Sequence, residues 1–273
     1  MPEWLPKDML VPLVVLGVAC VLCVLLSLLQ RRHVRRAARR ILTTATDLYS
    51  TRHEYRLVDA ADYPELDLSF YTDVTRRLIA CGFRHMGDLE NVTVARSFPR
   101  QRALLRSLLS ADGTVKALAY DVKTLGWMGL LPRFGVLPRD MRTVDLGTEL
   151  TDGTFLLTTT AHATLLSEPV PGIRRIVCPR STSTEDLLRH HHAAVTDALR
   201  SCPEVQPCAF GTLDEMLESE HRAQALRNAY RASKGYMDQE ELRRIAHGRW
   251  GRAVQGIGRE IERLKAERAD RRQ

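Results

Sequence analysis

An uncharged apolar run near the N-terminus constrains this chain more than any other feature. It covers the 20 residues 10–29, with the sequence LVPLVVLGVACVLCVLLSLL. The hydrocarbon core of a bilayer is roughly 30 Å thick and a helix rises about 1.5 Å per residue, so about 20 apolar residues span it. The run therefore predicts a transmembrane helix.

A group of arginines follows the apolar run directly and predicts its orientation. The N-terminal flank is nearly neutral, and flanks rich in arginine stay in the cytoplasm. We therefore expect a single-pass protein of the cell membrane, with its N-terminus outside and its main domain in the cytoplasm. Trp4 is expected at the outer interface, because aromatic residues gather there. At the inner interface we expect six arginines: Arg31, Arg32, Arg35, Arg36, Arg39 and Arg40.

The position of these arginines argues against two other interpretations. A cleaved signal peptide carries its basic residues before the apolar run and small residues at its cleavage site, and this run has neither. The net charge of +7 would suit a nucleic-acid-binding protein, but the arginines account for most of it and residues 41–208 are nearly neutral. Each arginine near an anionic leaflet contributes about 1 kcal/mol, so the expected partner is the lipid bilayer and not nucleic acid.

The cysteines that follow the anchor fit a reducing compartment. We expect Cys81, Cys178, Cys202 and Cys208 to be free thiols in the cytoplasm. The spacing of the last two matches no zinc pattern. The alternative is an extracytoplasmic domain with disulfides, which labelling of Cys81 or Cys178 from outside the cell would establish.

Helical patterns flank the middle of the chain. The arginines of residues 31–57 alternate with apolar residues, which predicts an amphipathic helix that continues the anchor, either as a simple stalk or lying on lipid or on the domain. One helix is expected at residues 67–81 and another at 184–200, begun by a capping box. In the tail we expect helices from Thr212 and Asp238, and a solvated end.

Two Asp-Gly pairs predict β-hairpins between these helices. They are Asp112-Gly113 and Asp152-Gly153, and Asp-Gly suits type I′ turns, in which both central residues have positive φ. Further strands are expected at residues 91–98 and 173–178. The sequence thus predicts an antiparallel sheet of about five or six strands.

Together these patterns predict an α+β protein. We expect a single N-terminal transmembrane helix, an antiparallel sheet flanked by two helices, and a helical C-terminal tail. The expected boundaries are residues 1–30 for the N-terminal segment with the anchor, 31–62 for the basic juxtamembrane stalk, 63–202 for the α+β domain and 203–273 for the helical extension.

The connection between the two hairpins, residues 124–141, is unusually apolar for a loop. It either covers the open end of the core, meets the bilayer or a protein partner at the inner membrane face, or forms the lid of a ligand pocket. Its candidate contact residues are Trp127, Met128, Leu130, Leu131 and Phe134.

Residues that would mark an active site are scarce. The chain contains none of the phosphate-binding, dinucleotide-binding, serine-hydrolase or zinc-protease motifs. His190, His191 and His192 point about 100° apart on a helix, so they cannot share one metal. Asp145 and Glu149 lie roughly 13 Å apart on one face of a strand, and we expect that face to meet solvent. We therefore expect no catalytic residue, no cofactor and no metal.

The expected function is accordingly an interaction or ligand-sensing module held at the inner membrane face, and not an enzyme. The alternative is a membrane-tethered enzyme without a recognisable motif, with a pocket between the sheet and residues 124–141. A buried cluster of ionisable groups around one cavity would favour that alternative.

Overall fold

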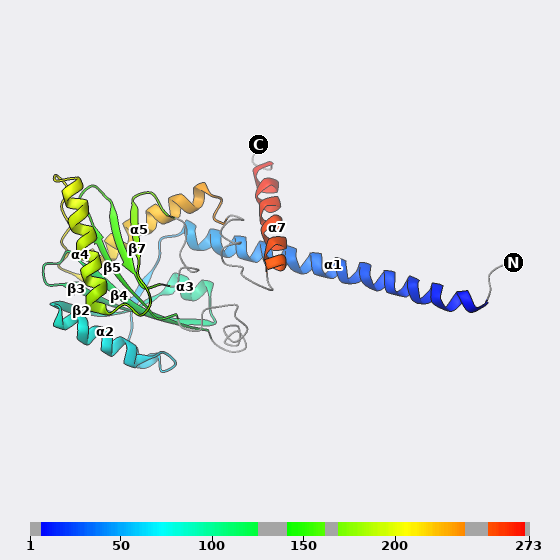
Figure 1. Ribbon diagram of the computed structural model, residues 1–273, viewed down its shortest axis with the longest axis horizontal. Helices are drawn as coiled ribbons and strands as arrows, with labels where there is room; N and C mark the ends of the chain where they lie inside the picture. Colours follow the sequence, from blue (N-terminus) through cyan, green and yellow to red (C-terminus); the bar gives the residue numbers. More distant parts are fainter. Residues whose placement is uncertain (1–6, 125–140, 162–168, 238–250, 271–273) are drawn as a thin grey trace. The chain divides into compact units, whose positions relative to one another are not determined.

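The computed structural model describes residues 7–124, 141–161, 169–237 and 251–270. It divides the chain into two compact units, of which one comprises residues 1–45 with 237–273 and the other residues 46–236. The larger unit contains a β-sheet with helices on it (Figure 1). The mixed α+β class expected from the sequence is confirmed.

The sheet has seven strands, and their spatial order is their order in the chain. Neighbouring strands are antiparallel except for the last pair, which is parallel. The sequence therefore underestimated the number of strands and missed the one parallel pair. The strands are β1 (Tyr55–Leu57), β2 (Phe83–Asn91), β3 (Gln101–Ser110), β4 (Lys116–Thr124), β5 (Thr143–Glu149), β6 (Phe155–Thr159) and β7 (Ile173–Val177).

The strand predicted at residues 91–98 is wrong. Strand β2 ends there, and the next six residues form the short helix α3 (Val92–Ser97). Asn91 caps this helix, because its side chain accepts a hydrogen bond of 3.0 Å from the backbone N–H of Val94. The cap outweighs the β-propensity of the valines and threonine that follow.

Both predicted hairpins are present, but their turn type is not I′. Gly113 and Gly153 have φ of 76° and 81°, whereas the aspartates before them do not have positive φ. In the first turn Asp112 accepts a hydrogen bond of 3.1 Å from the N–H of Thr114, and Asp152 makes the equivalent bond in the second turn. A turn followed by a left-handed glycine is the alternative hairpin connection.

Three long helices cover the two faces of the sheet (Figure 1). Helices α2 (Leu68–Ala80) and α4 (Thr184–Ser201) pack on one face and on each other. Helix α5 (Leu213–Ser233) lies on the opposite face, which we call the α5 face. The sequence predicted all three helices, and Gly82, with φ of 87°, ends α2 as expected.

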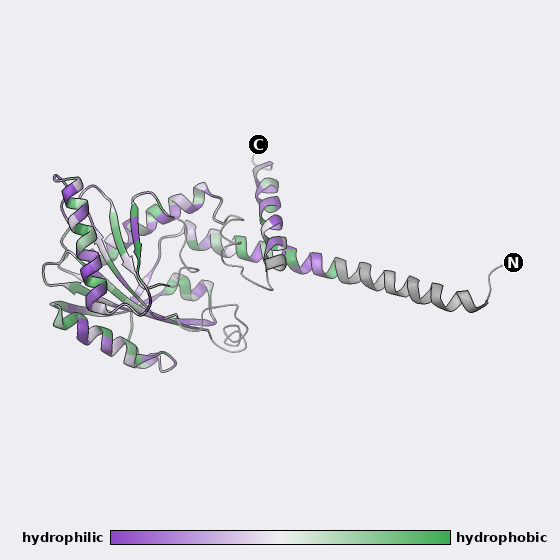
Figure 2. Ribbon diagram, viewed as in Figure 1, coloured by the Kyte–Doolittle hydropathy of each residue, from purple (hydrophilic) through white to green (hydrophobic). Residues whose placement is uncertain are grey.

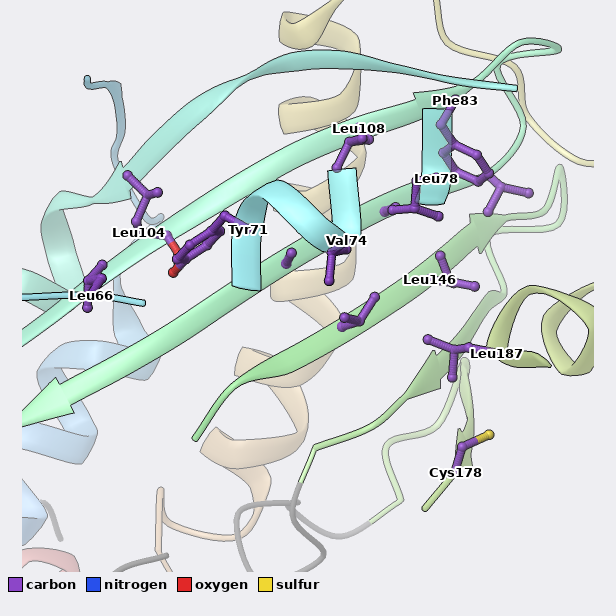
Figure 3. Packing of buried hydrophobic residues seen from close by; sticks show 14 of the residues in the cluster. Leu66, Tyr71, Val74, Leu78, Phe83, Leu104, Leu108, Leu146, Cys178 and Leu187 are labelled. Atoms are coloured by element: carbon purple, nitrogen blue, oxygen red, sulfur yellow. The ribbon is translucent and has the colours of Figure 1, made fainter. Parts of the chain in front are cut away.

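The main hydrophobic core lies between the sheet and helices α2 and α4 (Figure 3). Helices α2 and α4 each alternate hydrophobic and hydrophilic residues along their length (Figure 2), as expected for helices with one buried side. Tyr71 of α2 is fully buried, and its hydroxyl donates to the carbonyl of Leu104 at 2.9 Å and accepts from the N–H of Asp121 at 2.7 Å. The tyrosine thereby bonds α2 to the neighbouring strands β3 and β4.

Helix α5 begins with the predicted capping box. The Thr212 hydroxyl accepts from the N–H of Glu215, whose carboxylate accepts from the N–H of Thr212. Replacing Thr212 by Ala should lower the free energy of unfolding by about 1 kcal/mol. A urea titration of the full chain in detergent measures this, with alkylation of the buried Cys178 thiol, 6% exposed, as the probe of unfolding.

The control for this variant is Thr196→Ala, on the exposed side of α4. Because alanine is the better helix former, this change should leave stability unchanged or slightly higher. Equal effects of the two substitutions would contradict the role of Thr212 as a cap.

Among the described residues, the smaller unit contains α7 (Gly251–Asp270) and α1 (Lys7–Ser50) as far as residue 45, and the last five residues of α1 belong to the larger unit. Ala38 and Leu42 of α1 pack against Ile261 and Leu264 of α7, and all four are buried. The expectation of a solvated C-terminal end is therefore wrong for α7. The apolar side of the arginine-bearing helix is covered by this helix.

The predicted anchor and two other predictions fall mainly outside the described residues. The backbone of α1 is described from Lys7 but its side chains only from residue 28. No helix of the described part of the chain is long and apolar enough to cross a membrane. The predicted apolar connection at 124–141 and the helix predicted from Asp238 lie almost wholly outside the described ranges.

Candidate functional site

A pocket of about 120 Å³ lies between the α5 face of the sheet and helix α5. We call it the α5 pocket. Its walls are mainly apolar side chains from the central strands and from α5, among them Leu105, Leu118, Leu157, Phe155, Ile173 and Met216. Six polar or charged side chains from the strands and the helix also reach it: Tyr55, Ser107, Lys116, Asp145, Glu220 and Arg227.

The register of three strands aligns residues across the pocket floor. Lys116 of β4 lies opposite Gly147 of β5, which lies opposite Leu157 of β6. Because side chains alternate between faces along a strand, Asp145, Gly147 and Glu149 all belong to the α5 face. Gly147 leaves space at the centre of this row. A Cβ placed there would meet its nearest neighbours only at 3.9 and 4.0 Å.

Lys116 is the most unusual residue of the pocket because it is a lysine that is only 8% exposed. Its ammonium donates to Ser219 Oγ at 2.5 Å, and Ser219 in turn donates to Glu149 Oε2 at 2.5 Å. Burial lowers the pKa of Lys116, and the nearby carboxylates of Glu220 and Glu149 oppose that shift. The lysine thus sits at the end of a hydrogen-bonded chain between sheet and helix.

Glu149 joins this chain to an arginine of α5. Arg222 donates to its two carboxylate oxygens at 2.7 and 2.8 Å, the paired geometry that strengthens such contacts. Burial alone would raise the pKa of Glu149, but the bonds from Arg222 and Ser219 outweigh burial and lower it. Glu149 therefore remains ionised although it is 5% exposed.

Asp145 is the second acidic group of the row. Tyr120 donates to its Oδ2 at 3.2 Å, and Thr159 makes a short hydrogen bond to Oδ1. Burial raises the pKa of Asp145 to about 6, against these two hydrogen bonds. The expectation that Asp145 and Glu149 face solvent is wrong, because α5 covers the strand face on which they lie.

Three further polar side chains line the pocket. Arg227 and Glu220 of α5 form an ion pair with each other, and Glu220 keeps the pKa of Arg227 raised although burial alone would lower it. The Ser107 side chain is fully buried, and its hydroxyl has no hydrogen-bond partner among the described residues. A buried hydroxyl without a partner costs about 1–3 kcal/mol, so it marks a place where a ligand group can gain a bond.

One histidine of the triplet, His191, has a structural role on the other face of the sheet, whereas His190 and His192 are exposed. His191 is fully buried, and its two ring nitrogens lie 2.9 Å from the hydroxyls of Thr148 and Thr158. Burial lowers its pKa to about 4, so it is neutral at pH 7. No group of three His, Cys, Asp or Glu side chains within the described ranges is arranged to hold a metal ion.

The arrangement suits binding better than catalysis. A buried lysine next to a serine can activate the hydroxyl as a nucleophile. Ser219, however, is fully buried, already donates to Glu149, and is not part of the pocket wall. Lys116 and Ser107 instead offer hydrogen-bond donors inside an apolar pocket.

Sequence reasoning did not find this site. The residues it proposed are not among those described as lining the pocket: the arginines between Arg31 and Arg40 are in the smaller unit, and Trp4, Trp127, Met128, Leu130, Leu131 and Phe134 lie outside the described ranges. One feature of the sequence could have indicated the site. Lys116 alternates with Leu118 and Tyr120 in a strand rich in apolar residues, which is an unusual place for a lysine.

The chain was also compared with known proteins. It matches no protein-family model, and comparison with curated proteins and with solved structures gives no significant match.

Proposed function

We propose that this chain is a membrane-anchored ligand-sensing protein whose α+β domain binds a small molecule in the α5 pocket. The observation that carries this proposal is a mainly apolar cavity into which Lys116, Asp145 and the unpartnered Ser107 hydroxyl converge. Small-molecule sites are typically apolar pockets with a few polar groups that orient the ligand.

The membrane anchor is part of the proposal and rests on the N-terminal sequence. Residues 10–29 are uncharged and apolar over the length that spans a bilayer. The backbone of α1 is helical throughout this run and through the arginines that follow it. The arginines favour an orientation with the N-terminus outside and the α+β domain in the cytoplasm.

The walls of the pocket indicate the chemistry of the ligand. Charges of opposite sign already balance around it, since Arg227 pairs with Glu220 and Lys116 lies in the chain that ends at Glu149. A highly charged ligand would disturb this balance in a place with little water. We therefore expect a small molecule with an apolar body and one hydrogen-bonding end near Ser107 and Lys116.

Hexanoate and hexan-1-ol are suitable probes, because they share an apolar body and differ in the charge of the polar end. With the full chain in detergent, one of them should raise the urea midpoint for exposure of Cys178. A ligand at 100 times its Kd adds about 2.7 kcal/mol to stability. In Gly147→Val, whose side chain would fill the pocket, the same probe should have no effect.

Ser107→Ala separates ligand contact from pocket shape. Without ligand it should be neutral or slightly stabilising, because it removes a buried hydroxyl that has no partner. It should weaken the stabilisation by the probe, because the pocket stays open but loses a hydrogen bond. Equal stabilisation of wild type and Gly147→Val by the probe, or none of wild type by either probe, would refute the proposed site.

Two other functions expected from the sequence stay predictions. A membrane-tethered enzyme is the alternative, and the contact of Lys116 with Ser219 is the observation in its favour. A protein partner for residues 124–141 concerns a segment outside the described part of the chain. Crosslinking of the full chain, with and without these residues, would test it.

A further inference from the structure

A groove in the smaller unit is lined by one side of α1 and one side of α7. It has a volume of about 710 Å³. On α1 the lining includes Arg31, Arg32 and Arg35, and on α7 it includes Arg259 and Arg263. Residues three and four apart lie on the same side of a helix, so each helix presents one row of arginines to the same space.

Packing beside the groove holds the two rows together. Ala38 and Leu42 of α1 are buried against Ile261 and Leu264 of α7. In each helix these apolar residues are close in sequence to a groove arginine. Ala38 follows Arg35 by less than one turn of α1, and Leu264 directly follows Arg263 of α7. The arginines thus lie beside a packed helix pair and not on a single solvated helix.

Two of the five arginines are neutralised within the unit. Arg35 lies 3.4 Å from Glu260 and 3.7 Å from Glu267, and Arg263 lies 2.9 and 3.2 Å from the same two carboxylates. The other three, Arg31, Arg32 and Arg259, form no ion pair with any residue that the structure describes. The groove therefore has an excess of positive charge at three exposed guanidinium groups.

This excess charge has the chemistry that binds phosphate. Guanidinium groups donate paired hydrogen bonds to phosphate oxygens, and several converging on one groove give a site for a phosphorylated group. The groove starts at Leu28, whose side chain is 50% exposed and which belongs to the apolar run proposed as anchor. It is thus placed where the headgroups of the cytoplasmic leaflet would lie.

We propose that the groove between α1 and α7 binds the phosphate of an anionic phospholipid headgroup. This inference rests on the anchor in the proposed function and is independent of the α5 pocket. It assigns a role to the C-terminal helix, which supplies Arg259 and the ion pairs that position Arg35. Basic pockets beside membrane helices on the cytoplasmic side are known to take such headgroups.

The test compares two double variants that remove the same charge. Arg32→Gln with Arg259→Gln removes two groove arginines that form no ion pair within the described ranges. Arg200→Gln with Arg268→Gln removes two exposed arginines that neither line the groove nor belong to the arginines expected at the inner interface. Native mass spectrometry of the full chain in detergent, titrated with phosphatidylglycerol or cardiolipin, gives the apparent lipid affinity of each.

We expect the groove variant to lose about tenfold or more in lipid affinity, because charge-assisted hydrogen bonds are lost. The control variant should change by less than about threefold, as screened surface charge does. Equal losses in both would overturn the groove and leave only general attraction to the leaflet. If inorganic phosphate binds the full chain as tightly as the lipids do, the groove is a site for free phosphate, and the proposal of a lipid headgroup is wrong.

Two further measurements keep the outcome unambiguous. Amide hydrogen exchange of residues 257–264 shows whether α7 stays packed on α1 in the groove variant. If it stays packed while lipid affinity is unchanged, the proposal is wrong. Alkaline extraction of membranes tests the proposed anchor separately, and the hexanoate experiment tests the α5 pocket. A negative result for the groove can therefore be distinguished from a negative result for the anchor or the pocket.

Discussion

Asp145→Asn should raise the free energy of unfolding at pH 7.5 by about 2–3 kcal/mol. Burial under α5 raises the pKa of this carboxyl to about 6, whereas in the unfolded chain it titrates near 3.8. Above pH 6 the folded protein must hold an ionised carboxylate that the unfolded chain accommodates more easily. Asparagine keeps the shape and one acceptor for Tyr120 or Thr159, and removes the charge.

The pH dependence of this difference has a definite sign. Between pH 3.8 and 6 the folded state binds a proton that the unfolded state has released, so the contribution of Asp145 to stability falls as pH rises. His191 titrates oppositely. Burial lowers its pKa to about 4, below the 6.5 of the unfolded chain, so its contribution rises with pH in nearly the same window. The two trends oppose each other in the wild type, and Asp145→Asn should remove the falling one and leave the rise from His191 unopposed by Asp145.

Urea titrations at pH 4, 5, 6 and 7.5 measure this difference in stability. Alkylation of Cys178 again reports unfolding, and its rate is corrected for the pH dependence of the labelling reaction. The variant should match the wild type near pH 4 and become progressively more stable above it. Asp197→Asn, on the exposed side of α4, is the control and should change stability little at any pH. A variant that is no more stable than wild type at pH 7.5 would show that burial does not penalise Asp145.

Glu149→Gln should lower the free energy of unfolding by about 3 kcal/mol or more, because it breaks a buried ionic contact. Arg222, whose side chain is 52% exposed, can turn to water when its carboxylate is gone. Lys116 cannot, because it is buried under α5, and among the described residues its ammonium donates only to Ser219. The main penalty therefore falls on the lysine, which loses the negative charge behind that serine.

Glu218→Gln is the matched control, because Glu218 pairs with Arg52 at the surface. Exposed pairs contribute less than about 1 kcal/mol, so this variant should remain close to wild type in the same urea titration. Combining Glu149→Gln with Lys116→Met should recover part of the lost stability, since the buried cation is also removed. Additive losses in the double variant would argue against the coupling of the two charges.

The helices and hairpins were predictable because their signals are local. Thr212 with Glu215, Ser183 at the start of α4 and Gly82 at the end of α2 act through hydrogen bonds or dihedral angles of adjacent residues. Asn91 shows the limit of such signals. Its side chain begins a helix in a segment whose composition favours a strand.

The candidate site was not predictable because it depends on where α5 packs. The alternation of Asp145 and Glu149 with apolar residues correctly placed them on one face of a strand, but it cannot show what covers that face. The sequence predicts α5 as a helix, but the many polar residues of that helix do not indicate which surface it covers. Its Arg222 and Ser219 are in fact used to bond charged groups of the sheet.

The order of the strands has a consequence for synthesis of the chain. Because every strand pairs with its predecessor, each can join the sheet as it leaves the ribosome, and such short-range pairing favours rapid folding. Helix α5 emerges only after β7 is complete. Lys116 and Glu149 therefore remain hydrated on a finished sheet until Ser219 and Arg222 arrive, and burial of these charges is the step that completes the larger unit during synthesis.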